Sequence, residues 1–294
     1  MVSTNNKLVY IFTFIATILI LLTFTLSGNA QTLYSCEVPF DDFEHRLFTI
    51  DQNTGATLSE VVITLPGRNV RGCNGMAKDP TTGVCYVVLN VTEPETTNPR
   101  ILAVVNPFTG QAREIGNTGD AFSSIAFDSS GTLYGVTGNG GSNPETLFTI
   151  NKNTGVPTFF QTLGNGGDGE VIAFNPVDGL MYHNSGDVFE SINLSTGVIT
   201  PILDDYGERT AMVHQSGNVF LVANFAAFES ITTTGVQQNI GDFDIDMKGL
   251  AFDCGIPTGL ARPIPTLSEW GLIAMAGVLG LVGFFAIRRR KVTA

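Results

Sequence analysis

The chain has 294 residues, 43% of them hydrophobic, and its 27 acidic residues outnumber its 15 lysines and arginines for a formal net charge of −12. All the acidic residues except Glu269 lie between residues 31 and 261. Because proteins that hold nucleic acid need a basic surface, this charge excludes nucleic acid as a partner. It is typical of a soluble surface protein, or of one that meets a cationic partner or divalent ions.

The first 30 residues have the pattern of a signal peptide. Lys7 is followed by an apolar span from Leu8 to Leu26, and Ser27–Ala30 supplies small residues before Gln31. The pattern predicts a signal helix in residues 1–30, with cleavage before Gln31. Because the apolar span is long for a signal peptide, an uncleaved membrane anchor is the alternative.

A Thr-Gly pair recurs through the middle of the chain at intervals of roughly 40 to 55 residues, and each pair follows an apolar, β-rich run. The pairs are Thr54-Gly55, Thr109-Gly110, Thr154-Gly155, Thr196-Gly197 and Thr234-Gly235. An Asp or Asn stands three residues before four of them, and Ile231 stands before the fifth. An Asp or Asn side chain can accept hydrogen bonds from the backbone while Gly supplies a positive φ, so each pattern predicts a tight turn.

A second marker follows each turn, and a Gly-containing turn and another strand come after it in the first four units. The markers are Met76–Asp79, Ile125–Asp128, Ile172–Asn175, Ala211–His214 and Leu250–Asp253. Each unit therefore contains about four short strands, which is the pattern of a propeller blade.

The fifth unit ends at Asp253 without its last strand, and the missing piece stands at the other end, in Leu33–Cys36. We therefore predict an all-β, five-bladed β-propeller over residues 31–255, whose N-terminal strand closes the last blade and leaves no open edge. The alternative is a pair of β-sandwiches, which gives no reason for the chain ends to complete one unit. Residues 256–263 are expected to form a linker.

Four cysteines lie in this region, and an even number in an exported protein favours disulfides. We prefer Cys36–Cys254, because both lie in the blade that joins the chain ends, and this leaves Cys73–Cys85 as the second pair. The spacings lack the close pairs of a zinc site.

Few residues suggest chemistry in the predicted propeller, and no catalytic residue can be assigned. Asp242, Asp244 and Asp246 alternate, so on a strand their carboxylates would share one face and could hold Ca²⁺, although a solvated strand face is the simpler interpretation. The Gly-rich stretches at 138–141 and 164–169 lack the Lys-Ser/Thr of a phosphate loop. The histidines, at positions 45, 183 and 214, have structural places in the repeat; no cofactor is therefore expected beyond that Ca²⁺.

The C-terminal tail, residues 264–294, has three parts. A short motif at 264–271 precedes an apolar stretch at 271–287, which is long enough to cross a bilayer as a helix. A basic stop at 288–291 follows and favours the cytoplasmic side, so the domain before it should lie outside. The residues that define the motif and the stop are Ile264, Pro265, Thr266, Leu267, Trp270, Gly271, Arg288, Arg289 and Arg290.

This tail resembles the IPTL-CTERM sorting signal of Gram-negative bacteria. The resemblance implies recognition by an exosortase-type membrane transpeptidase, insertion in the inner membrane, cleavage near the motif and transfer to the cell envelope or surface. Pro265 keeps the motif extended, as a peptide held by such an enzyme must be.

Two functions are consistent with the sequence. The first is a non-enzymatic propeller that binds a surface glycan or protein, with ligand contacts in loops near Asn90–Arg100, Gly138–Glu145 and Gly164–Glu170. The second is an exported hydrolase acting on glycans or lactones, with carboxylates and Ca²⁺ at the central channel. Two carboxylates about 5–10 Å apart in one funnel, flanked by exposed aromatic residues, would favour the hydrolase. A channel lined by Ser, Thr and apolar groups would favour binding.

Overall fold

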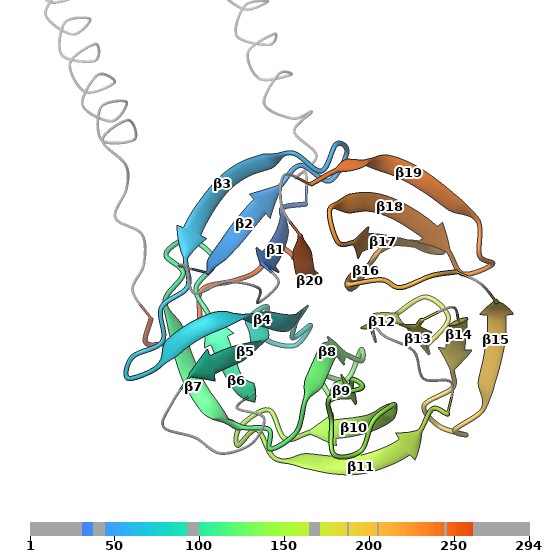
Figure 1. Cartoon of the computed structure of the whole chain (residues 1–294), viewed down its shortest axis with the longest axis horizontal. Coiled ribbons are helices and arrows are strands. Elements are labelled where there is room, and N and C mark those ends of the chain that lie inside the picture. The colour runs from blue at the N-terminus through green and yellow to red at the C-terminus, as the bar shows by residue number, and fades with distance from the viewer. Residues whose placement is uncertain are drawn as a thin grey trace, which may run out of the picture.

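The computed structural model describes residues 31–37, 45–92, 100–164, 171–186, 188–204, 206–243 and 246–260. These residues form five four-stranded antiparallel sheets arranged as blades around a central axis (Figure 1). The fold is therefore the predicted all-β, five-bladed propeller, and the sandwich alternative is wrong. The predicted signal helix, the motif and the membrane stretch lie outside these residues. Within the described part of the chain, no helix is long and apolar enough to cross a membrane.

Each blade runs from an inner strand beside the axis to an outer strand at the rim (Figure 1). The closing blade contains β20 (Met247–Phe252), β1 (Leu33–Glu37), β2 (Arg46–Ile50) and β3 (Thr57–Val62). The next contains β4 (Asn69–Lys78), β5 (Cys85–Thr92), β6 (Arg100–Val105) and β7 (Ala112–Asn117). The third contains β8 (Phe122–Phe127), β9 (Leu133–Thr137), β10 (Thr146–Ile150) and β11 (Pro157–Thr162). The fourth contains β12 (Val171–Asn175), β13 (Leu180–Ser185), β14 (Val188–Ile192) and β15 (Ile199–Leu203). The fifth contains β16 (Ala211–Ser216), β17 (Val219–Asn224), β18 (Ala227–Thr232) and β19 (Gln237–Asp242).

The two ends of the chain close the ring by completing one blade. Strands β1 and β20 pair antiparallel, with Leu33 opposite Phe252. Beyond this pair, the Asp253 N–H donates to the carbonyl of Thr32 and the Thr32 N–H donates to Oδ1 of Asp253, both at 2.9 Å. Inside an uninterrupted blade, Asp128 makes the same two contacts with Thr132: its N–H donates to the Thr132 carbonyl at 3.0 Å, and its Oδ1 accepts the Thr132 N–H at 2.9 Å. The chain ends therefore reproduce the turn that the other blades make covalently, which confirms the predicted closing strand.

The ring has two unlike faces, which we name by the connections that lie there. The turn face is where the inner strands end; it carries the turns after them, such as 79–84 and 128–132, and both described chain ends. The loop face is where the inner strands begin. The strands on either side of 93–99, of 138–145 and of 163–170 all end at the loop face.

The tight turns form as the sequence predicts. In the first, Oδ1 of Asp51 accepts the Asn53 N–H at 2.8 Å, the Asp51 carbonyl accepts the Gly55 N–H at 2.8 Å, and Gly55 has a φ of 81°. In the fifth, where Ile231 replaces the Asp or Asn, Oγ1 of Thr232 accepts the Val236 N–H instead. A Thr hydroxyl can therefore replace the carboxylate or amide oxygen in this turn.

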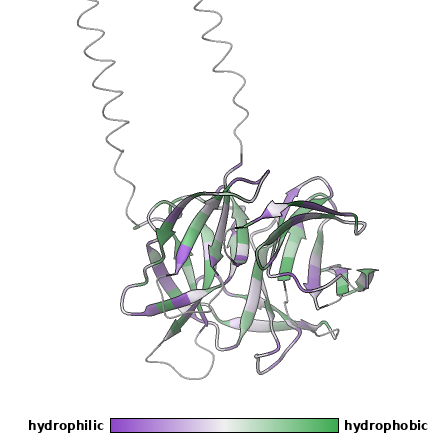
Figure 2. Ribbon diagram, turned by 45° about the horizontal axis from the view of Figure 1, so that its top comes forward, coloured by the Kyte–Doolittle hydropathy of each residue, from purple (hydrophilic) through white to green (hydrophobic). Residues whose placement is uncertain are grey.

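The core lies between neighbouring blades, where apolar residues of each sheet pack against the next sheet. Figure 2 shows bands of hydrophobic and hydrophilic residues along the strands. Strands such as β8 are buried at every position, because a neighbouring blade covers each side of the sheet. The aromatic residues at equivalent repeat positions are all buried: Phe48, Phe148, Phe189, Tyr86, Tyr134 and Tyr182.

The disulfides join Cys36 to Cys73 and Cys85 to Cys254, so the predicted pairing is wrong. The β1–β20 register places Cys36 opposite Lys248, near the loop face, whereas Cys254 follows β20 at the turn face. Cysteines of one blade at opposite faces cannot meet, and each instead bonds to a cysteine of the neighbouring blade at its own level.

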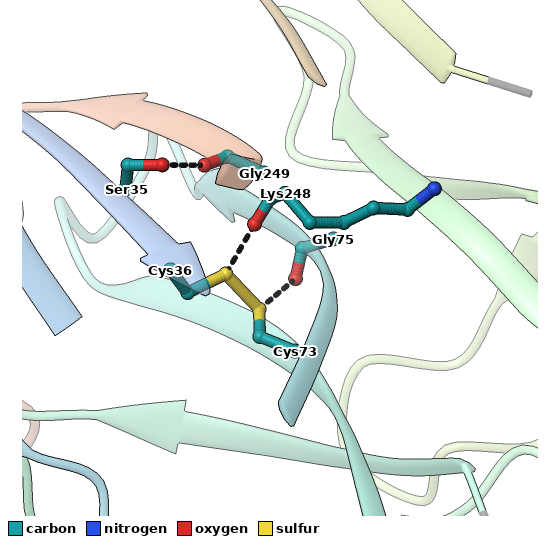
Figure 3. Close-up of a disulfide and its surroundings, with 6 residues drawn as sticks. All are labelled: Ser35, Cys36, Cys73, Gly75, Lys248 and Gly249. Carbon is teal, nitrogen blue, oxygen red and sulfur yellow. Dashed lines mark hydrogen bonds between the residues drawn. A yellow bond between two sulfur atoms is a disulfide. The ribbon is translucent and has the colours of Figure 1, made fainter. Parts of the chain in front are cut away.

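Both disulfides connect the closing blade to the blade that contains β4 and β5. Figure 3 shows the loop-face disulfide: Sγ of Cys36 lies against the carbonyl of Lys248, and the hydroxyl of Ser35 donates to the carbonyl of Gly249 at 2.9 Å. One disulfide therefore holds β1, and the other holds the segment after β20, to the same neighbour.

Candidate ligand-binding channel

A cavity of about 300 Å³ lies on the axis of the ring, in the half nearer the turn face. All five inner strands line it, because they run parallel to one another and present equivalent residues to the axis. Cavities that hold small molecules begin at about this volume, so the channel is large enough for a small ligand.

The inner part of the channel is apolar and follows the repeat, whereas polar residues join the lining toward the turn face: Gln31, Asp128, Ser129, His214 and Gln215. An inner ring is formed by residues 77, 126, 173, 212 and 251, namely four alanines and Met212. One residue closer to the turn face, the mouth ring consists of Lys78, Phe127, Phe174, Val213 and Phe252. Such walls stabilise an apolar ligand group by removing it from water.

Three groups with charge or titration chemistry lie at the mouth, and two of them make hydrogen bonds in turns. Oδ1 of Asp128 accepts from the N–H and hydroxyl of Ser130, at 2.9 and 2.7 Å, and from the Thr132 N–H at 2.9 Å. Nε2 of His214 lies 3.1 Å from the carbonyl of Gly217, which fixes that nitrogen as a donor. Lys78 is the third.

Lys78 is the one lysine or arginine among the described residues of the lining, and its ammonium makes no ion pair or hydrogen bond there. It is not among the predicted site residues, although the sequence contains a signal for it. Phe127, Phe174 and Phe252 occupy the equivalent position in three other repeats, so a lysine departs from the pattern.

An ion pair with one buried partner joins two blades next to the mouth ring. Lys152, in the turn between β10 and β11, donates to Oδ2 of Asp79 at 2.6 Å, and the side chain of Asp79 is completely buried. Burial alone would raise the pKa of Asp79, but hydrogen bonds from Lys152 and Thr81 outweigh that effect and hold the pKa below its ordinary value of 3.8. Asp79 is therefore an ionised, paired carboxylate that joins two blades.

The acidic side chains of the lining bear on the choice between binding and glycoside hydrolysis. Among the described residues that line it, Asp128 is the one carboxylate, and its Oδ1 already accepts three hydrogen bonds from the turn. General acid–base cleavage of a glycosidic bond commonly needs two carboxyl groups about 5 to 10 Å apart. The channel lining does not supply that pair.

The predicted Ca²⁺ ligands are only partly described. Strand β19 ends at Asp242. Asp246 lies just before β20, and Asp244 lies outside the described residues. No group of three potential metal ligands occurs among the described residues, and the Ca²⁺ site stays a prediction.

The Gly-rich stretch at 138–141 has a structural role. Asp120 is buried, and its Oδ1 accepts the N–H groups of Ala121 and Ser142, at 2.8 and 2.7 Å. Its Oδ2 accepts the Asn143 N–H at 3.3 Å. Within the stretch, the Gly138 N–H donates to the Ala121 carbonyl and the Gly141 N–H to the Gly138 carbonyl, so these two donors are used inside the protein. Most of the second stretch, 164–169, lies outside the described residues.

A second polar cluster, also missed from the sequence, is buried in the loop-face half of β13 and β14. His183 and Glu190 lie opposite each other, with Nδ1 and Oε1 3.0 Å apart, and both side chains are completely buried. Nearby, the hydroxyl of Ser185 donates to Oε2 of Glu145 at 3.1 Å, and Glu145 has a φ of 53°. The third histidine, His45, is also buried.

Comparison with known families identifies the tail. A family model described as the IPTL-CTERM motif matches residues 262–290. The chain therefore combines a five-bladed propeller with an IPTL-CTERM sorting signal, which indicates export in bacteria, association with the envelope and processing by a sorting enzyme such as an exosortase. The motif residues from Ile264 onward lie outside the described structure.

Solved structures resemble the propeller only distantly. One chain of a nidogen/laminin complex is 13% identical with a TM-score of 0.49, and the match covers 78% of this chain and 100% of that one. A protein of unknown function from Bacteroides caccae is 12% identical with a TM-score of 0.48, covering 76% and 99%. Neither likeness bears on ligand or partner. A search of curated proteins finds no significant match.

Proposed function

We propose that this chain is an exported binding protein, which a sorting enzyme of the exosortase type processes at its tail and transfers to the envelope or surface of a Gram-negative bacterium. The proposed route includes a signal peptide in residues 1–30, an inner-membrane intermediate held by the apolar stretch 271–287, and cleavage near Pro265.

The lining of the channel carries the binding role. Its inner part is apolar, its mouth contains the unpaired ammonium of Lys78, and its one carboxylate accepts hydrogen bonds in a turn. A site of this kind can hold and orient a small molecule, and its described lining offers no second carboxyl group for the two-carboxylate cleavage of a glycoside.

Ring closure suggests how the protein is presented. After β20 the chain pairs with the turn face, where the Gly255 N–H donates to the Gly83 carbonyl, and the described residues end at 260, two residues before the segment that the sorting-signal model matches. The loop face, with the connection Gly138–Glu145, then lies on the far side of the ring from the tether. It is the surface that a glycan or protein partner would meet, in line with the ligand-contact loops expected from the sequence.

The binding role is tested against hydrolysis with the exported full-length protein. We expect no cleavage of polysaccharides or lactones, and the variant Asp128→Asn should behave as the wild type. Turnover by the wild type that Asp128→Asn abolishes would overturn the proposal, since it would make the channel carboxylate a catalytic residue.

The sorting route is tested by Pro265→Ala. The variant should accumulate as a larger, membrane-retained form, because an extended motif is needed for recognition. Lys291→Ala, in the basic stop, is the control for tail expression, and it should leave processing largely intact because three arginines remain. Unchanged size and location of Pro265→Ala would refute recognition of this motif.

A further inference from the structure

The mouth ring of the channel has one residue that its repeat does not explain. Three of its five positions hold phenylalanine, and the fourth holds Val213. At the fifth, Lys78 brings an ammonium to a ring whose other four members are apolar. A charged group in such a place loses part of its hydration, which costs free energy unless a partner compensates it.

The ammonium of Lys78 has no such partner in the described part of the protein, although other cations there do. Lys78 is only partly exposed, so water can compensate it only in part. The other described ion pairs of lysine and arginine are Arg46–Glu60, Arg68–Glu114, Lys152–Asp79 and Arg209–Glu229. In a protein with 27 acidic residues, a channel lysine without a carboxylate indicates a place for a carboxylate from outside.

The acidic groups nearest in sequence and repeat position do not fill that place. Asp79, the next residue, is paired with Lys152. Asp128, one residue beyond Phe127 in the repeat, directs Oδ1 to the N–H and hydroxyl of Ser130. Both carboxylates are held in turns.

We propose that the channel binds a small amphipathic carboxylate, with its alkyl or aryl body between the inner strands and its carboxylate at Lys78. This inference rests on the proposed binding function and names the ligand class. The cavity of about 300 Å³ is at the lower end of the range for small-molecule sites, so the ligand is expected to be small.

An opposite ligand is conceivable, because aromatic rings can cage a quaternary ammonium group. Phe127, Phe174 and Phe252 would be the walls of such a cage. Lys78 occupies the same ring, however, and would repel a second cation there. Tighter binding of a cationic ligand than of a carboxylate would therefore contradict the proposal.

The first experiment titrates the exported full-length protein with three probes of equal chain length, decanoate, decan-1-ol and decyltrimethylammonium, by isothermal calorimetry. Decanoate should bind most tightly, decanol roughly tenfold more weakly for lack of the charge-assisted contact, and the ammonium most weakly. If decanol equals decanoate, or if the ammonium binds best, the ligand class is wrong while the channel remains a binding cavity. If no probe binds, the binding function fails as well.

A variant pair locates the carboxylate. Lys78→Gln should weaken decanoate binding about tenfold and leave decanol binding unchanged, since only the charged contact is lost. Arg113→Gln makes the same change of charge at an exposed position of β7 and should affect the binding of neither probe. Equal losses of decanoate binding in the two variants would show a general effect of charge and overturn the assignment to Lys78. Decanol binding also verifies that Lys78→Gln is folded.

Discussion

At the turn face, every blade ends its inner strand near a short turn capped by its own side chains, and even the chain ends copy that turn through Asp253 and Thr32. At the loop face, the described structure depends on individual buried groups. Asp120 holds one connection through the Ser142 and Asn143 N–H groups, and the His183–Glu190 pair lies buried between β13 and β14. The repeat therefore determines the geometry of one face and leaves the other free to vary, and one disulfide fastens each face to the same neighbouring blade.

Removing the two disulfides separately is the strongest way to compare the faces. The turn-face disulfide, Cys85–Cys254, joins residues 169 apart in the sequence, and the loop-face disulfide, Cys36–Cys73, joins residues 37 apart. Loop-closure entropy predicts losses of about 5 kcal/mol for Cys85→Ser with Cys254→Ser, and about 4 kcal/mol for Cys36→Ser with Cys73→Ser. Denaturant unfolding of the exported protein measures both. A larger loss of stability on removing Cys36–Cys73 would show that the loop length closed by each disulfide does not decide its contribution to stability.

Breaking the buried pair in the loop-face half should have the next largest effect. His183→Leu leaves the carboxylate of Glu190 buried without its partner, and we expect a loss of about 3 kcal/mol. The double variant with Glu190→Leu should recover much of it, because the uncompensated group is then gone. Equal stability of the single and double variants, measured by thermal or denaturant unfolding, would contradict this explanation.

The turn-face ion pair should matter less at neutral pH, because Lys152 is 29% exposed on its side chain. Lys152→Met should cost about 2 kcal/mol. The pKa of Asp79 is lowered in the folded state, so its contribution is fully present above its ordinary value of 3.8 and is lost as pH falls through the lower, folded value. The stability difference between wild type and Asp79→Asn should therefore shrink on acidification below about pH 4. A difference that grows there would reverse the sign of the linkage.

The sequence predicted the features that depend on local pattern and missed those that depend on register. Turns such as that at Asp51 need only an oxygen acceptor and a glycine at fixed spacing, and ring closure followed from an incomplete fifth unit. Disulfide pairing depends on which face each cysteine reaches, and the β1–β20 register fixes this by placing Cys36 beside Lys248. The His183–Glu190 pair likewise depends on the register of β13 and β14, which no local motif encodes.

The smallest expected effect comes from comparing the turn at Asp128, which is continuous in the backbone, with the similar contact between Asp253 and Thr32. Asp253→Ala removes the acceptor for the Thr32 N–H and should cost about 1 kcal/mol. Asp128→Ala removes a similar acceptor from a turn whose residues stay joined by the backbone. Hydrogen exchange distinguishes the two variants. Asp253→Ala should speed exchange at the β1–β20 pair, where fraying can begin at free ends, whereas Asp128→Ala should affect its own turn alone. Equal protection of β1 in both variants would mean that the disulfides, rather than this copied turn, keep the ring closed.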